Sequence, residues 1–534
     1  MIQQSATSMH RPVNCGWRCT AWRAGVQAAV QGAALLLASA ALTPALAQQR
    51  EPFPGLDAYI TAAIKQWKVP GLGMAIVRND SVIYARGYGV REVGRPEAVD
   101  DKTVFAIGSS SKAFTSAAVA MLVDEKKVVL DASPGTYFPG FQLYDPYASR
   151  ELTVRDLLSH RSGLARGELA WYGSGFDRDE IVRRVRYLKP SWSFRAQFGY
   201  QNIMYITAGQ VVAKVSGRSW DDFIRERIFT PLHMTASSSS IKGLESVTDL
   251  AQPHAELNDT VRKVPWRNID NAGPAGSINS NAADMAQWLR LQLGRGKYEG
   301  KQLISSRMTD EMHQAQMVIR VDSAARANNP DTHLQAYGMG WFLEDYRGRF
   351  VVHHGGNVDG FTALVAMMPE EKFGVVFLTN MNGTGLPNAL MHKVFDLQLK
   401  APAKDWSGEA LKRLEAQRAR ARQMQARQES QRVANTRPTL PLSAYAGTYV
   451  DSLYGDVVVK EENGKLQLTF GPNWRGEMEH YQYDAFRVKF DTPVLPVVPA
   501  VFQINGAGKV ESVQLDMAGV AEFRKKPDGA PMNR

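Results

Sequence analysis

The stretch "IGSSSKAF" (107–114) places three serines before a lysine, and a serine with a lysine three residues later can form a nucleophile and its base. About two Ser-x-x-Lys matches are expected by chance in a chain of this length. The chain contains two, Ser109 with Lys112 and Ser239 with Lys242. Only the first precedes a run of helix formers, "AFTSAAVAMLV", in which residues three apart share a face. Helical spacing therefore selects Ser109 among the three serines, and the second match lies in the polar loop "TASSSSIKG".

A lysine base must be neutral, which predicts an enclosed site. Lowering a lysine pKa from ~10.4 to ~7.4 costs about 4 kcal/mol, so another polar group has to share the proton. The segment "FGYQNIMY" offers Tyr200 and, two residues later, Asn202, which point the same way if the backbone is extended. Tyr200 taken alone is more typical of a core residue.

The segment "VVHHGGNVDGF" is the third candidate. It places His353 and His354 at the end of a predicted strand, followed by Gly355 and Gly356, which allow a backbone or a ligand to approach closely. A metal site is the competing interpretation. Adjacent strand residues face opposite ways and no third ligand lies nearby in the sequence, so we predict no metal here.

These three pieces together resemble the penicillin-recognising serine hydrolases. The motifs are Ser109-x-x-Lys112, Tyr200-x-Asn202 and His353-x-Gly355, in that order. The more similar branch includes class C β-lactamases, D-alanyl-D-alanine carboxypeptidases, D-aminopeptidases and family VIII esterases. Supporting phrases are "LLSHRSGL", "PLHM", "PAGSINSNAADMAQW", "YGMGW" and "VVFLTN", and the resemblance covers roughly residues 51–400.

The resemblance implies a role for each matching residue. Ser109 would be the acylated nucleophile, Lys112 and Tyr200 would move its proton, and Asn202 would bind the amide side of the substrate. The backbone N–H groups of Ser109 and Gly356 would form the oxyanion hole. The resemblance implies no metal and no organic cofactor.

One departure concerns the start of the third motif. His353 stands where the β-lactamases have a lysine that binds the substrate carboxylate. A neutral imidazole binds an anion less well, which argues against efficient β-lactam hydrolysis and strict carboxypeptidase action. The motif can also start one residue later, at His354. We prefer His353 because that register leaves Gly355 and Gly356 in the family's positions.

The elements around these motifs predict an α/β fold. Apolar runs around the turn at 79–81 and across 340–382 indicate strands that pair in one antiparallel sheet. Between them, "SKAFTSAAVAMLVDEKK", "TVRDLLSH", "MYITAGQVVAKVSG", "WDDFIRERIF" and "NAADMAQWLRLQL" have apolar residues at helical spacing. We therefore expect a β-lactamase-like domain over 51–400, with an antiparallel sheet flanked by helices and an inserted helical lobe.

The N-terminus predicts export. Three arginines precede the apolar run "AVQGAALLLASAALTPALA", which ends in Ala45-Leu46-Ala47, so residues 1–47 read as a signal peptide of a periplasmic or secreted protein. A retained membrane anchor is the alternative. Cys15 and Cys19 both lie in this segment, so the mature chain should contain neither disulfides nor a cysteine nucleophile.

The C-terminal third differs from the rest of the chain in charge and in the periodicity of its apolar residues. Residues 401–438 include "LKRLEAQRARARQMQARQESQRV", with seven basic and two acidic residues, which predicts a solvated helical linker. Weak association with an anionic cell envelope is the alternative, and the absence of interleaved aromatics argues against nucleic-acid binding. Period-two alternation then predicts a small β-barrel-like domain over 439–527.

The leading hypothesis is an acyl-serine hydrolase outside the cytoplasm. The resemblance favours small peptide or amide substrates, including peptides with D-residues or linear peptides derived from toxins. Carboxylic esters come second and β-lactams third. A non-catalytic cell-wall-binding module is the alternative from another class. The pairing of Ser109 with Lys112 and Tyr200 argues against it, because a binding module has no need of a neutral lysine.

Overall fold

The computed structural model describes residues 51–517 and 519–527, which belong to one compact unit. The expected signal peptide at 1–47 and both cysteines lie outside the described residues. Within the described part of the chain, every helix is too short or too polar to cross a membrane.

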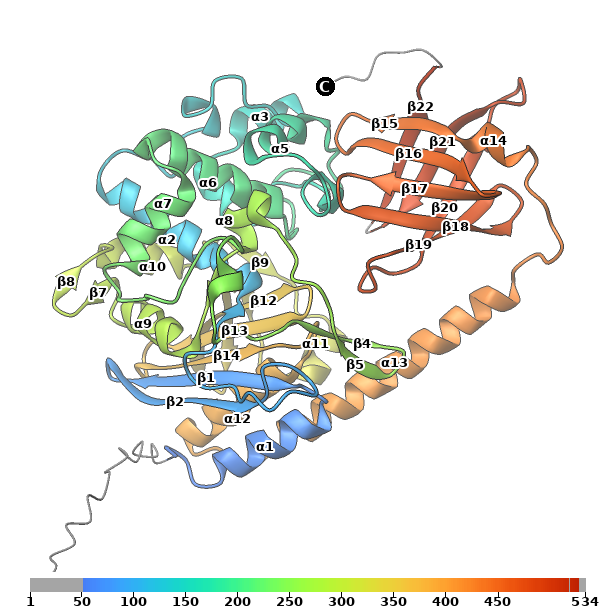
Figure 1. Cartoon of the computed structure of the whole chain (residues 1–534). Coiled ribbons are helices and arrows are strands. Elements are labelled where there is room, and N and C mark those ends of the chain that lie inside the picture. The colour runs from blue at the N-terminus through green and yellow to red at the C-terminus, as the bar shows by residue number, and fades with distance from the viewer. Residues whose placement is uncertain (1–50, 518, 528–534) are drawn as a thin grey trace, which may run out of the picture. The chain divides into compact units, whose positions relative to one another are not determined.

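An antiparallel sheet of eight strands is the centre of the larger part of the molecule (Figure 1). The predicted pairing of its two sequence-distant parts is confirmed, because β1 pairs with β14. The expected turn at 79–81 is formed by Asn79-Asp80, and a turn at Arg347-Gly348 connects another pair of adjacent strands. In spatial order the strands are β2 (Ser81–Gly89), β1 (Gly71–Arg78), β14 (Phe373–Thr379), β13 (Phe361–Met368), β12 (Arg349–Val358), β11 (Phe342–Tyr346), β10 (Gln335–Tyr337) and β9 (Met317–Ile319).

Helices cover both faces of the sheet, which is why all seven residues of β14 are buried. On one face, side chains such as Met74 and Phe377 pack with α1 (Leu56–Gln66), α12 (Leu386–Leu399) and the start of α13 (Trp406–Ser430). Their strand neighbours Ala75 and Leu378 belong to the core on the other face, as the alternation of a strand requires.

The inserted helical lobe that was predicted is present, and it lies on that second face (Figure 1). Its core joins α2 and α6 to the sheet through α9, which packs on β1 and β14. The helices between β2 and β11 are α2 (Ser111–Asp124), α3 (Pro146–Glu151), α4 (Val154–Leu157), α5 (Arg178–Arg184), α6 (Asn202–Ser216), α7 (Trp220–Ile224), α8 (Gly273–Gly276), α9 (Ala282–Leu293), α10 (Ser306–Met312) and α11 (Ser323–Asn328). Three small pairs complete it: β3 (Phe105–Ala106) with β6 (Asn279–Ser280), β4 (His254–Leu257) with β5 (Thr260–Lys263), and β7 (Lys297–Tyr298) with β8 (Lys301–Gln302).

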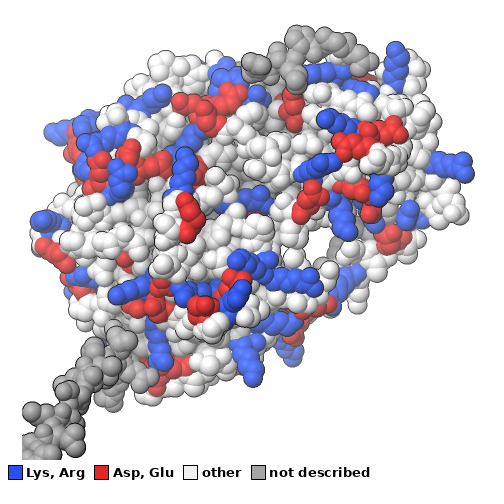
Figure 2. Space-filling view, in the orientation of Figure 1, with Lys and Arg blue, Asp and Glu red and all other residues white. Residues whose placement is uncertain are grey.

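The basic segment forms the long helix α13, and its polar residues are mostly exposed. Part of its charge is paired with the β4–β5 hairpin: Arg418 contacts Glu256 at 2.7 Å and Arg422 contacts Asp259 at 2.8 Å. Figure 2 shows cationic and anionic side chains interspersed over much of the visible face.

The C-terminal region is a closed antiparallel barrel, so the barrel-like prediction is confirmed. Alternate residues of strands such as β17 point into its core, and β15 pairs with β22 to close it. After the short helix α14 (Leu442–Tyr445), the strands are β15 (Gly447–Asp451), β16 (Gly455–Glu462), β17 (Lys465–Phe470), β18 (Trp474–Gln482), β19 (Ala485–Phe490), β20 (Val498–Ile504), β21 (Val510–Asp516) and β22 (Val520–Lys525).

Candidate active site

Ser109 and Lys112 lie side by side, as the helical spacing predicted. Ser109 belongs to the short 3-10 turn Gly108–Ser110 that leads into α2, and it opens into a cavity of about 450 Å³. Lys112 is fully buried in the first turn of α2, with its Nζ 3.0 Å from the Ser109 Oγ. The turn thus presents the hydroxyl to the cavity and keeps the amine behind it.

The surroundings of Lys112 suit a neutral amine. Its Nζ donates to the Asn202 Oδ1 and to the Ala275 carbonyl oxygen, both at 2.7 Å. Burial lowers the pKa of Lys112 well below its usual value, although the Glu168 carboxylate acts in the opposite direction. A neutral amine has two N–H donors, so with both engaged its lone pair is left for the Ser109 hydroxyl.

Tyr200 and Asn202 line the same cavity, in the arrangement the sequence predicted. The residue between them, Gln201, is extended (φ −139°, ψ 113°), and its side chain turns away to cap α6. Burial raises the pKa of Tyr200, while a hydrogen bond with Ser109 opposes the shift. The phenol therefore stays protonated at neutral pH and can give a proton as well as accept a hydrogen bond.

His160, from the phrase "LLSHRSGL", holds the Tyr200 segment from both sides. The Gly199 N–H donates to the His160 carbonyl oxygen at 2.8 Å, and the Gln201 N–H donates to its Nδ1 at 3.0 Å. The imidazole also packs on the Tyr200 ring, with 4.2 Å between centroids. Its backbone is left-handed (φ 55°), a strain typical of functional sites. No role for His160 was predicted, although the phrase "LLSHRSGL" that contains it was identified.

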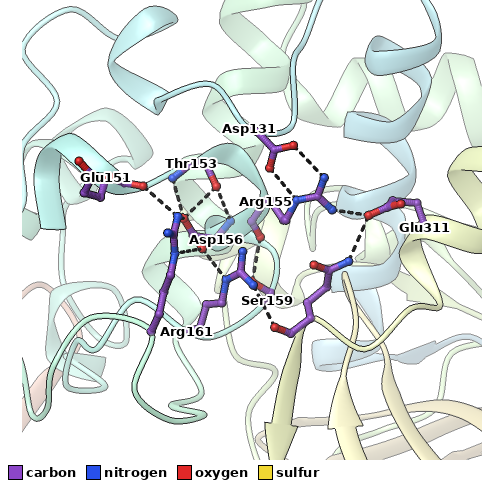
Figure 3. Close-up of polar contacts among 10 residues, drawn as sticks. Asp131, Glu151, Thr153, Arg155, Asp156, Ser159, Arg161 and Glu311 are labelled. Atoms are coloured by element: carbon purple, nitrogen blue, oxygen red, sulfur yellow. Dashed lines mark hydrogen bonds and ion pairs between the residues drawn. The ribbon is translucent and has the colours of Figure 1, made fainter.

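A buried ionic network supports the loop that carries His160 (Figure 3). The Asp156 carboxylate is fully buried and accepts from Arg161, from the Thr153 N–H at 2.8 Å and from Arg195 at 2.6 Å. Burial alone would raise the pKa of Asp156, but Arg195 and Arg161 lower it, so the carboxylate stays charged. The Arg161 guanidinium then reaches the Gln316 carbonyl oxygen at 2.9 Å, which ties the loop to the edge of the large sheet.

The structure corrects the expected start of the third motif. Val352, His354 and Gly356 point toward the helical lobe, and only His354 of the two histidines lines the Ser109 cavity. His353 points to the opposite face, where its ring stacks on Phe342 and lies in a neighbouring cavity. The preference for His353 is therefore wrong. It followed the spacing of the glycines, whereas the alternation of the strand decides which histidine faces Ser109.

His354 is held as a neutral imidazole. Its Nε2 lies 3.0 Å from the Tyr337 hydroxyl and its Nδ1 lies 2.6 Å from the Gly355 carbonyl oxygen. The Nδ1 therefore carries the proton and the Nε2 accepts one from Tyr337. Burial lowers the pKa of His354 to about 3, so the ring carries no charge at neutral pH.

The expected oxyanion donor also shifts by one residue. Two-residue turns join β12 to β11 and to β13, and the residues flanking such turns exchange both backbone hydrogen bonds. Counting from these turns, the Gly356 N–H points to β13, whereas the Asn357 N–H points past the end of β11. Gly356 therefore cannot supply the second donor, and the geometry favours Asn357.

Gly356 has a different role, which is to let β12 approach the nucleophile. A Cβ at Gly356 would lie 1.8 Å from the Ile107 carbonyl oxygen and 3.0 Å from the Ser109 nitrogen. A Cβ at Gly108 would lie 2.6 Å from the Asn357 nitrogen. The N–H groups of Ser109 and Asn357 thus belong to backbone segments in direct contact. Gly355 lines the cavity, and the atom nearest to its Cβ position is 3.5 Å away.

Two charged residues of the cavity were not identified from the sequence. Arg166 and Glu168 form an ion pair of 2.8 Å, and the Asn202 Nδ2 lies 3.3 Å from one Glu168 carboxylate oxygen. Burial raises the pKa of Glu168, while Arg166 opposes the shift. Both residues lie in a loop without regular spacing, whose course cannot be derived from the sequence. No cluster of three or more potential metal-binding side chains occurs within 51–517 and 519–527.

Family models match most of the chain. A model described as Beta-lactamase matches residues 56–396. A second, described as a domain of unknown function (DUF3471), matches residues 431–532, which include the barrel.

Relatives and solved structures extend these matches. The "Unguisins hydrolase ungD" of Aspergillus violaceofuscus (strain CBS 115571) is 28% identical over 84% of this chain and 84% of its own length. A second, ungD' of Aspergillus campestris (strain IBT 28561), is 29% identical over 89% and 88%. The octameric penicillin-binding protein homologue from Pyrococcus abyssi shares the fold, with a TM-score of 0.58, 21% identity and coverage of 88% of this chain and 99% of that one.

Proposed function

The chain belongs to the β-lactamase family of serine hydrolases, and on this premise we propose that it is a periplasmic or secreted hydrolase that cleaves amide or peptide bonds through an acyl-Ser109 intermediate. One observation carries the mechanism. The buried Lys112 Nζ lies 3.0 Å from the Ser109 Oγ, and Asn202 and Ala275 accept its two N–H groups.

Acylation begins when Ser109 attacks the substrate carbonyl. Its proton moves to the Lys112 lone pair, and Tyr200, which is hydrogen-bonded to the same hydroxyl, keeps its own proton for the leaving group. The N–H groups of Ser109 and Asn357 stabilise the oxyanion, and the Ser109 N–H stands at the positive end of α2.

The leaving group then needs a proton, and Tyr200 is placed to give it. The phenol is protonated at neutral pH and the imidazole of His160 holds it in place. The Lys112 ammonium then restores the phenol proton, and in deacylation Lys112 and Tyr200 take a proton from the attacking water and return it to the Ser109 oxygen. Asn202 is fixed by Lys112 and Glu168, which leaves one Nδ2 hydrogen for the amide of the substrate.

Three features support amides and peptides ahead of β-lactams. His354 is neutral, so the position that binds a carboxylate in the β-lactamases has no charge here. The cation of the cavity, Arg166, is already paired with Glu168. Two relatives of nearly full length carry the name unguisins hydrolase. Peptides with D-residues and linear toxin-derived peptides are the substrates to try first.

A substrate panel tests the proposal. The purified protein is assayed with D-alanyl and D-leucyl anilides, p-nitrophenyl esters and nitrocefin, next to the Ser109→Ala and Ser239→Ala variants. We expect turnover of anilides that Ser109→Ala abolishes and Ser239→Ala retains. Turnover of esters with every anilide inert would replace the amide assignment by the carboxylesterase alternative. Inert substrates of all classes would favour the non-catalytic module.

A further inference from the structure

A second cavity of about 350 Å³ opens beside the Ser109 cavity. The two share part of their walls, so they are contiguous regions of one cleft. The residues that line both are Arg166, Glu168, Trp171, Ile269 and Asn357.

The far wall of this second cavity comes from the C-terminal barrel. Val494, Leu495 and Pro496 lie in the connection between β19 and β20, and Met517 follows β21. These side chains are apolar, and Trp474 at the start of β18 adds an aromatic surface.

Direct contacts fix this wall against the lobe. Trp474 packs edge-to-face on Tyr172, with 5.1 Å between the ring centroids. A Cβ at Gly173 would lie 2.4 Å from the same indole, so the loop can pass there only as glycine. Farther along, the Arg184 guanidinium donates to the Ser452 carbonyl oxygen at 2.7 Å. The barrel wall is therefore packed on the lobe, within the same compact unit.

The position of the catalytic groups decides which half of a substrate enters this cavity. Ser109, Tyr200 and His354 line the first cavity and not the second. The leaving group must lie beside Tyr200, because that residue gives it a proton. The second cavity extends from Asn357 past Asp359 to the barrel, and Tyr200 does not line it, so we assign it to the acyl half.

We propose that the barrel completes the substrate site by forming a subsite for an apolar group, an aromatic or branched aliphatic side chain, on the acyl half of the substrate. This rests on the proposed function and deepens it. Burying a group of this size removes apolar surface from water and is worth one to two orders of magnitude in selectivity, about 10–100-fold.

Two p-nitrophenyl esters with the same leaving group test the subsite. The ratio of kcat/KM for the 4-phenylbutanoate ester to kcat/KM for the acetate ester measures how much the larger acyl group increases catalytic efficiency. We expect Val494→Glu and Met517→Glu to lower this ratio about tenfold or more, because a carboxylate in the cavity opposes burial of the phenyl ring. The matched control is Val497→Glu, in the same connection, whose side chain is 54% exposed and does not line the cavity. Thermal unfolding confirms that each variant is folded.

A binding measurement separates this inference from the proposed function. Calorimetry follows 4-phenylbutanoate binding to the Ser109→Ala protein, with and without Val494→Glu, and we expect about tenfold weaker binding with the added carboxylate. If the wild type hydrolyses neither the anilides nor the esters but this difference in binding appears, the proposed function fails and the subsite stands. An unchanged ester ratio in both Val494→Glu and Met517→Glu, or equal binding with and without Val494→Glu, would overturn the subsite.

Discussion

The chain contains the same four-residue pattern twice, and only one copy is built for chemistry. At Ser109, the lysine three residues later is fully buried and its Nζ lies 3.0 Å from the serine hydroxyl. At Ser239, the equivalent Lys242 is exposed in a loop, and its backbone N–H donates to the Ser240 hydroxyl. Burial lowers the pKa of Lys112 well below its usual value.

The two copies differ in the residues around the serine and the lysine, and these residues decide whether the lysine can act as a base. Lys112 has Asn202 and Ala275 to take its N–H groups, and Tyr200 adjoins the same hydroxyl. Strand β12 completes the cavity on the other side, through Gly356. None of these partners is present at Ser239, whose loop lines a separate cavity.

Replacing the two lysines should give the largest difference. Lys112→Met removes the group that accepts the Ser109 proton, and loss of such a base lowers the rate by about 10²–10⁴-fold. Lys242→Met should leave kcat/KM unchanged, because its side chain is exposed outside the site. Steady-state kinetics on the most active substrate measures both. Equal loss in the two variants would contradict the assignment.

The close approach of β12 can be broken with one methyl group. Gly356→Ala forces a Cβ against the Ile107 carbonyl oxygen, so the strand must move away from Ser109. We expect a fall in kcat of about 10²-fold or more, as on losing an oxyanion donor. Thermal unfolding provides the control: Gly355→Ala has room for its Cβ and should unfold near the wild-type temperature, below which Gly356→Ala should fall. Equal unfolding temperatures would argue against this packing.

Removing the contacts by which His160 positions Tyr200 should have an effect of intermediate size. His160→Ala removes the acceptor of the Gln201 N–H, so we expect kcat to fall about tenfold while KM changes little. His160→Asn keeps an acceptor oxygen and should restore part of the rate. His233 is the matched control, since it shares the left-handed backbone (φ 58°) but is exposed. If His233→Ala lowered kcat as much, a positioning role for His160 would be untenable.

The smallest effect is a dependence of stability on pH. The folded protein keeps Lys112 neutral, whereas the unfolded chain binds a proton below pH ~10.4. The unfolded state therefore holds more protons between the lowered pKa and that value, and the free energy of unfolding rises with pH there by up to ~1.4 kcal/mol per pH unit. Denaturant titrations at pH 7 and 9 should show this rise in wild type and in Lys242→Met, and lose it in Lys112→Met.

Much of the fold could be predicted, because the spacing of apolar residues indicates which segments form helices and which form strands. Alternating and helical spacing identified the antiparallel sheet, the inserted helices and the turn at 79–81, which Asn79 and Asp80 form with positive φ. The barrel-like domain was predicted from the period-two alternation of apolar and polar residues alone. What spacing cannot give is the closure of the barrel through β15 and β22, which depends on pairing between distant residues.

The site was predicted where residues sit on regular elements and missed elsewhere. Ser109, Tyr200 and Asn202 line one cavity, and Lys112 contacts Ser109 and Asn202 behind it, as their spacing indicated. The histidine was misassigned because one residue of register exchanges the two faces of β12, and only the turns at its ends fix that register. Arg166 and Glu168 reach the cavity along an irregular loop, so no periodic signal marks them.

Mapping a covalent adduct tests the central claim most directly. Wild type, Ser109→Ala and Ser239→Ala are incubated with a fluorophosphonate, and the modified peptide is identified by mass spectrometry. We expect one adduct per molecule on Ser109 in wild type and Ser239→Ala, and none in Ser109→Ala. An adduct on Ser239, or undiminished labelling of Ser109→Ala, would contradict it.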